Sequence, residues 1–267
     1  MKNTVLFFIL VLFMSCCHKK TNVESDLTSL VGKADSIVKP IYTAKQLYDK
    51  LELFYKCGYS DSMKQLFTEW KDVIEPNSLD SIQRNDTIKE IFSVYEAFYI
   101  GFHQKLNYHY KRVVIQNEVD YVIVPDKVLE KISGWDIRNK SSIKDFRPPL
   151  RRDQVLYLTD NYAKAIRLFL EDDRMMRHKK DTLKYRLSEE ETHKRADFLR
   201  EYIYIRHGHW GRYWHIETLP YVNFILLNET LTRARLEFRE GDGGADYVME
   251  KEKDQWVMKK RMGFWIE

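Results

Sequence analysis

The sequence predicts an α+β fold in which an N-terminal helical layer is followed by helices packed on a curved antiparallel sheet that ends in a C-terminal meander. Three observations predict this fold. Apolar residues recur at spacings of three and four between residues 44 and 102. Short runs rich in valine, isoleucine and tyrosine begin near residue 108. A glycine-rich segment, residues 240–244, separates two of the later runs, as in a hairpin.

The first 17 residues indicate export and a lipid anchor. Residues 5–14 form an apolar run that is shorter than the about 20 residues of a membrane-spanning helix, and the run fits the core of a secretory signal. Ser15 and Cys16 follow, and this succession resembles the lipobox of bacterial lipoproteins. The resemblance implies that residues 1–15 are a signal peptide and that Cys16 carries lipid such as palmitate. A cleaved secretory signal without lipid and an uncleaved anchor are the alternatives.

The resemblance implies that the protein belongs to the cell envelope, with its folded part outside the cytoplasm and the membrane as a partner through the N-terminal lipid. The formal net charge of +4 falls to +3 when residues 1–15, which hold one lysine and no acid, are removed. A nucleic-acid binder usually carries a concentrated basic patch, so no nucleic-acid partner is expected.

Cys57 is expected to be a small buried apolar residue without a reactive role.

A polar stretch, residues 16–39, is interpreted as a linker, and residues 40–106 as a helical lobe. Apolar positions at helical spacing predict a first helix that ends at Gly58. A second helix is expected to follow Ser60, and a third to begin near Asp86. We expect the three helices to pack together as one small layer.

The remaining residues, 107–267, are expected to form the α+β lobe. Thr159 or Asp160 is expected to cap one helix, and Ser188 another. A polar segment with adjacent prolines, residues 134–152, predicts an irregular connection, and a short apolar run follows at 155–158. Strands are predicted at 108–114, 119–124, 221–227, 231–238, 247–251 and 256–260, and residues 264–266 are expected to end the sheet.

The glycine-rich segment, residues 240–244, admits two interpretations. Its backbone N–H groups could bind an anion. A phosphate-binding loop, however, is expected to connect a strand to a helix and to continue with lysine and then serine or threonine, and neither feature is present. A plain hairpin turn is therefore favoured.

The densest group of chemically versatile side chains lies between residues 205 and 217. If this stretch is a hairpin, a two-residue turn at 211–212 pairs His207 with Ile216. A three-residue loop at 210–212 instead pairs His207 with His215. That second register places five side chains on one face, namely His207, His209, Tyr213, His215 and Glu217. A third possibility is that His207 and His209 end a preceding helix, and then no hairpin exists.

Two functions follow from these alternatives. The favoured one is a binding or assembly module, in which a small molecule, a glycan or an envelope protein contacts a pocket or face rimmed by Trp210, Tyr213, Trp214 and His215, because aromatic side chains offer rigid contact area with a polar handle. It requires no cofactor and no metal. The alternative is a metal-assisted hydrolase, with His207, His209 and His215 as ligands and Glu217 as general base. A purely structural envelope component would lack a concave pocket here.

Short matches in the C-terminal half carry a further resemblance. They are L-Y-L-T-D-N-Y at 156–162, G-H-W-G-R-Y-W-H at 208–215, R-L-E-F-R at 235–239, G-G at 243–244 and W-I-E at 265–267. They resemble an uncharacterised family of bacterial lipoproteins, and the order of helix and sheet resembles the nuclear-transport-factor-two-like (SnoaL-like, cystatin-type) fold. That fold implies a cone with an apolar pocket, which some members use for catalysis and many for binding alone. The resemblance assigns no catalytic residue here.

Overall fold

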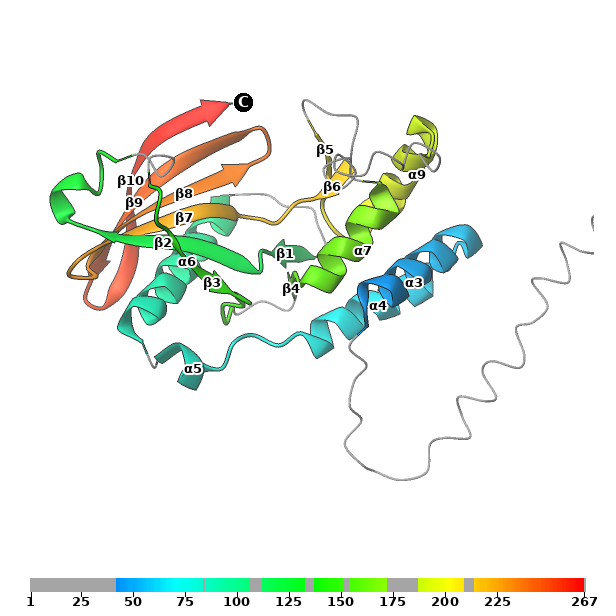
Figure 1. Cartoon of the computed structure of the whole chain (residues 1–267), viewed down its shortest axis with the longest axis horizontal. Helices are drawn as coiled ribbons and strands as arrows, with labels where there is room; N and C mark the ends of the chain where they lie inside the picture. The colour runs from blue at the N-terminus through cyan, green and yellow to red at the C-terminus, as the bar shows by residue number, and fades with distance from the viewer. Residues whose placement is uncertain are drawn as a thin grey trace, which may run out of the picture. The chain divides into compact units, whose positions relative to one another are not determined.

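The structure confirms the predicted α+β class (Figure 1). It is a computed structural model that describes residues 42–83, 85–105, 112–132, 137–150, 154–171, 187–208 and 214–266. The predicted signal peptide, the lipidated Cys16 and the linker lie outside these residues. No helix in the described part of the chain is long and apolar enough to cross a membrane.

Capping residues mark several of the helix ends. Thr43 forms a capping box with Gln46 at the first helix, and Gly58 ends that helix with φ of 65°, a left-handed conformation that glycine adopts without strain. Thr159 and Ser188 cap two later helices, each accepting a hydrogen bond from a backbone N–H three residues on. The helices are α3 (Ala44–Cys57), α4 (Ser60–Val73), α5 (Leu79–Gln83), α6 (Asp86–Lys105), α7 (Asp160–Leu170) and α9 (Glu189–Arg200).

A six-stranded sheet has the order β10-β9-β8-β7-β2-β3. The four strands that come last in the chain, β7 to β10, form the predicted antiparallel meander. Within this sheet only the β2–β7 pair is parallel. The strands are β2 (Glu118–Val124), β3 (Ser141–Lys144), β7 (Tyr221–Asn228), β8 (Arg233–Glu240), β9 (Gly243–Glu252) and β10 (Gln255–Ile266). Strand β3 lies where an irregular connection was predicted. This prediction is wrong because β3 is a short edge strand whose side chains are largely exposed, so no apolar alternation marks it.

Two small two-stranded sheets complete the described strands. β1 (Val113–Ile115) pairs in parallel with β4 (Val155–Tyr157), so the short apolar run at 155–158 includes a buried strand. β5 (Ile205–His207) pairs antiparallel with β6 (Trp214–Ile216), and we call this pair the β5–β6 ribbon.

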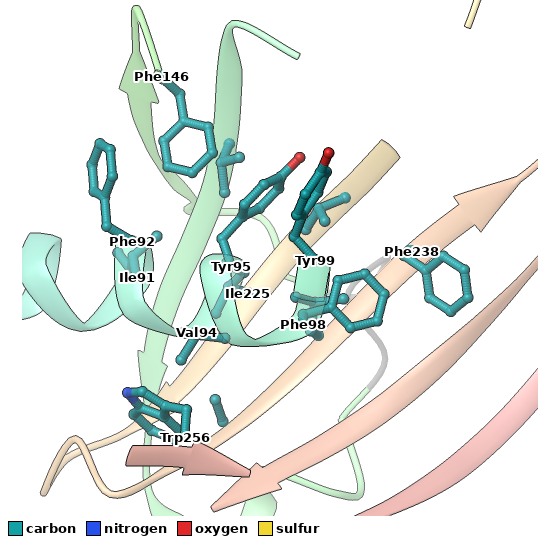
Figure 2. Packing of buried hydrophobic residues seen from close by; sticks show 14 of the residues in the cluster. Ile91, Phe92, Val94, Tyr95, Phe98, Tyr99, Phe146, Ile225, Phe238 and Trp256 are labelled. Carbon is teal, nitrogen blue, oxygen red and sulfur yellow. The ribbon is translucent and has the colours of Figure 1, made fainter. Parts of the chain in front are cut away.

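Helix α6 packs its aromatic residues on the six-stranded sheet and forms the first core (Figure 2). Tyr95, Phe98 and Tyr99 are almost fully buried, at positions that helical spacing places on one face. Phe98 contacts Phe238 of β8 with ring centroids 5.0 Å apart. Each such side chain contributes about 1.5–3 kcal/mol by leaving water, so this face holds α6 to the sheet.

The second core joins α3 and α4 to α7, α9, the β5–β6 ribbon and strands β1 and β4. Trp70 of α4 stacks on Tyr162 of α7 at 3.9 Å between ring centroids, and its indole N–H donates to the carbonyl of Tyr157 at 2.8 Å. The prediction that α3, α4 and α6 form one layer is therefore wrong. The apolar face of α6 is covered by the sheet, whereas α3 and α4 bury theirs against α7 and α9, which follow much later in the chain.

The expectation for Cys57 is also wrong, because its side chain is exposed. The buried positions of α3 include Leu47 and Leu51. Cys57 lies six residues beyond Leu51, and at about 3.6 residues per turn this spacing turns it away from the buried face. Its position within the helical period, rather than its apolar character, determines its exposure.

Candidate functional site

The β5–β6 ribbon pairs His207 with Trp214, Arg206 with His215 and Ile205 with Ile216. Both predicted registers are therefore wrong, and so is the possibility that His207 ends a helix. Residues 209–213 lie outside the described part of the chain. The register follows from burial, because Ile205, Trp214 and Ile216 share the face that packs into the second core.

The observed register separates two of the three histidines proposed as metal ligands. His207 lies on the face of Trp214, with ring centroids 4.8 Å apart, whereas His215 lies on the opposite face with Arg206. The arrangement that placed His207 and His215 on one face is wrong for this reason, and His209 is not described. Among the residues that the structure describes, no group of three or more His, Cys, Asp or Glu side chains could hold a metal ion.

Trp214 does not line the pocket beside the β5–β6 ribbon, contrary to expectation. Its side chain is buried in the second core, and the guanidinium carbon of Arg200 lies 4.1 Å from the centre of its ring. His215 lines this pocket beside the β5–β6 ribbon. Trp210 and Tyr213, the other two predicted rim residues, lie outside the described residues.

This pocket has a volume of about 410 Å³. It lies between strands β2 and β7, the β5–β6 ribbon with residues 217–218, the turn after β8, and helix α7. Most of its lining side chains are polar or charged, in contrast to the apolar pocket that the resemblance implies. We refer to it below as the polar pocket.

Gln116 fixes one wall of the polar pocket. It is buried, and its side-chain amide donates to the carbonyls of Glu118 at 2.6 Å and Val222 at 2.8 Å. Its side-chain oxygen accepts from the N–H of Val222 at 2.6 Å. One amide therefore ties the start of β2 to β7, and this wall is rigid because breaking any of these buried bonds leaves a polar group unsatisfied.

A second wall is the turn between β8 and β9, held against the residues that follow β6. The N–H of Gly241 donates to Glu217 at 2.7 Å, and Arg206 lies 2.6 Å from Asp242 and 3.5 Å from Glu217. Gly241 has φ of 66°, and a Cβ there would lie 1.8 Å from a guanidinium nitrogen of Arg206. The pairing of Glu240 with Gly243 confirms the plain hairpin. Glu217, considered above as a general base, has contacts that hold this turn in place.

The remaining charges of the polar pocket surround Tyr221. Loss of water around its hydroxyl, followed by the carboxylates of Asp120 and Glu118, raises the pKa of Tyr221, while the guanidinium groups of Arg239 and Arg167 act to lower it. Two acids of β2 and two arginines, from β8 and α7, therefore act on the same hydroxyl.

These charged groups differ in their partners. Glu118 forms an ion pair with Lys144, and Asp120 accepts a hydrogen bond from the hydroxyl of Ser142. Arg239 donates from Nε to the carbonyl of Gly241 at 3.0 Å. Arg167, which is partly buried, makes no hydrogen bond or ion pair with any residue that the structure describes. Its guanidinium is thus available to a ligand.

The sequence interpretation missed most of these residues. Glu118 and Asp120 alternate with apolar residues along β2, a pattern that indicates a polar face. Arg167 carried no comparable signal, because one arginine on an amphipathic helix is indistinguishable from a solvated residue. Only the packing of α7 beside the sheet brings it into the pocket.

The fold and the site define the class of the molecule as an α+β protein with a polar pocket of ligand size. Comparison with protein-family models, with curated protein sequences and with solved structures finds no match to the chain.

Proposed function

We propose that the protein is a binding module that holds a small polar molecule in the polar pocket. The observation that supports this proposal is a cavity of about 410 Å³ whose polar walls are held by hydrogen bonds and ion pairs. Small-molecule sites typically measure about 300–1,000 Å³. A site with fixed walls also loses less conformational entropy when a ligand binds.

A small polar molecule fits this pocket better than a protein partner does. The centres of protein interfaces are depleted in charged residues and enriched in aromatic ones. The lining of the polar pocket has the opposite character, with three arginines, four acids and one tyrosine. Its concave form and its volume also suit a small ligand.

The binding proposal predicts that filling the pocket abolishes binding. Asp120→Trp places a large side chain in the lining, and Ile123→Trp is its matched control, because Ile123 lies on the same strand but is exposed and outside the lining. We expect a panel of sugars, amino acids, dicarboxylates and phosphates, screened by ligand-observed NMR, to contain binders of the wild type. Those binders should be lost in Asp120→Trp and kept in Ile123→Trp.

Absence of any binder in the panel would contradict the binding proposal. So would a binder whose signal is equally strong in the wild type and in a folded Asp120→Trp variant, because such a molecule binds elsewhere.

We further propose that Cys16 carries a lipid that anchors the folded part to a bacterial membrane, outside the cytoplasm. The support is the succession of an apolar run, Ser15 and Cys16 at the start of the chain. A labelled fatty acid fed to expressing cells should enter the wild type and the control Cys17→Ala, but not Cys16→Ala. Label retained in Cys16→Ala would contradict the anchor at this residue.

A further inference from the structure

Acidic and basic side chains from different elements line the polar pocket. Asp120 lies on β2, and Arg239 lies on β8, with β7 between these two strands. Neighbouring strands are about 4.8 Å apart, so the backbones of β2 and β8 are separated by about 9–10 Å. Tyr221 of β7 is directly paired with Arg239 and lines the pocket between the two charges. The lining therefore offers a ligand both negative and positive side chains.

Ion pairs within the pocket leave a defined set of charges for a ligand. Arg206 is engaged by Glu217 and Asp242. Glu118 is engaged by Lys144. Among the described residues this leaves Asp120, which accepts a hydrogen bond from the neutral hydroxyl of Ser142, and Arg167, which makes no hydrogen bond or ion pair with any of them.

The side chain of Arg167 suits a carboxylate. The guanidinium of Arg167 has no partner among the described residues, and a guanidinium presents parallel N–H donors that match the two oxygens of a carboxylate. Asp120 suits an ammonium group, since its carboxylate accepts hydrogen bonds and supplies the opposite charge. Tyr221 also lines the pocket, and its hydroxyl can donate or accept a hydrogen bond.

We propose that the ligand is a small zwitterion, an amino acid or a dipeptide, with its carboxylate at Arg167 and its ammonium group at Asp120. This inference rests on the proposed function, because it names the class of molecule that the polar pocket binds.

The test compares polar amino acids and dipeptides in three forms: free, N-acetylated and C-amidated. Affinities are measured by calorimetry. Acetylation removes the positive charge, and amidation removes the negative one. We expect the free form to bind about tenfold or more tighter than either blocked form, because each blocked form loses one charged hydrogen-bonding group.

Two variants assign each charge to its residue. In Arg167→Gln, the difference between the free and the C-amidated form should disappear, while the difference from the N-acetylated form remains. In Asp120→Asn, the difference between the free and the N-acetylated form should disappear, while the difference from the C-amidated form remains. Lys164→Gln is the matched control, because Lys164 is exposed on the same helix as Arg167 and lies outside the lining, and it should behave like the wild type.

The outcomes separate the two proposals. Equal binding of the three forms to the wild type overturns the zwitterion, whatever the variants do. If the pocket instead binds sugars, dicarboxylates or phosphates, and Asp120→Trp abolishes that binding, the proposed function stands and the zwitterion fails. If no panel member binds, both fail.

Discussion

Replacement of Arg206 by alanine is expected to lower the free energy of unfolding by about 3 kcal/mol, because it removes one partner from a buried ion pair. The side chain of Glu217 is only 8% exposed and lies 3.5 Å from the Arg206 guanidinium. The same guanidinium lies 2.6 Å from Asp242 in the turn that forms a pocket wall. Arg206→Ala should therefore weaken ligand binding as well as stability.

Two further variants show whether the loss of stability in Arg206→Ala comes from the contacts of the Arg206 side chain. Arg138→Ala removes an exposed arginine and should change the unfolding free energy by less than about 0.5 kcal/mol. Arg206→Lys keeps the charge but loses the planar fork that reaches two carboxylates, so its stability should lie between those of wild type and Arg206→Ala. Urea unfolding measures all three variants. Equal stability of Arg206→Ala and Arg138→Ala would contradict a structural role for the Arg206 side chain.

A second large effect is expected at Glu52, which connects α3 to α9. Its carboxylate accepts a hydrogen bond from Arg195 and lies 3.0 Å from Lys56. The side chain of Glu52 is 12% exposed and that of Arg195 is 6% exposed. Because charged hydrogen bonds contribute about 1.5–3 kcal/mol each, we expect Glu52→Gln to cost about 2 kcal/mol near neutral pH.

This contribution depends on pH. Burial acts to raise the pKa of Glu52, but the hydrogen bonds and positive charges of Lys56 and Arg195 outweigh it, and the pKa lies below its usual value of 4.5. Stability from a lowered pKa is fully present above the unfolded-state value and is lost as the pH falls through the folded-state value. The difference in unfolding free energy between wild type and Glu52→Gln should therefore shrink as the pH falls below 4.5.

The control for Glu52 is Asp49→Asn on the same helix. Asp49 is 53% exposed and forms an ion pair with Lys45 at 2.6 Å. Exposed pairs contribute about 0–1 kcal/mol, so this variant should differ little from wild type at any pH. A gap between wild type and Glu52→Gln that stays constant, or widens, as the solution is acidified would show that the carboxylate charge is not what stabilises the α3–α9 contact.

Features set by neighbouring residues were predicted well from the sequence. The end of α3 at Gly58, the cap at Ser188, and the meander with its turn at Gly241 occur as expected, and Thr159 is the one of the two predicted candidates that caps α7. Each depends on side-chain and backbone chemistry within a few residues. Such signals are read directly from the chain.

Features set by distant partners were not predicted. The register of the β5–β6 ribbon depends on which face enters the second core, and the burial of Trp214 decided it. Helix α6 does not pack with α3 and α4, because the sheet covers its aromatic face and most strands of that sheet lie much later in the chain. The polar pocket combines Asp120, Arg167 and Arg239, which are brought together only by tertiary packing.

The central claim is that the polar pocket binds the ligand, and amide chemical shifts of the labelled protein test it most directly. A binder from the panel should produce its largest shifts at pocket amides such as Asn117, Thr218 and Asn223. Trp70, in the second core, should not shift. Large shifts confined to the exposed apolar residues of β10, Phe264 and Ile266, would contradict the claim, because the molecule would then bind at the sheet edge and not in the pocket.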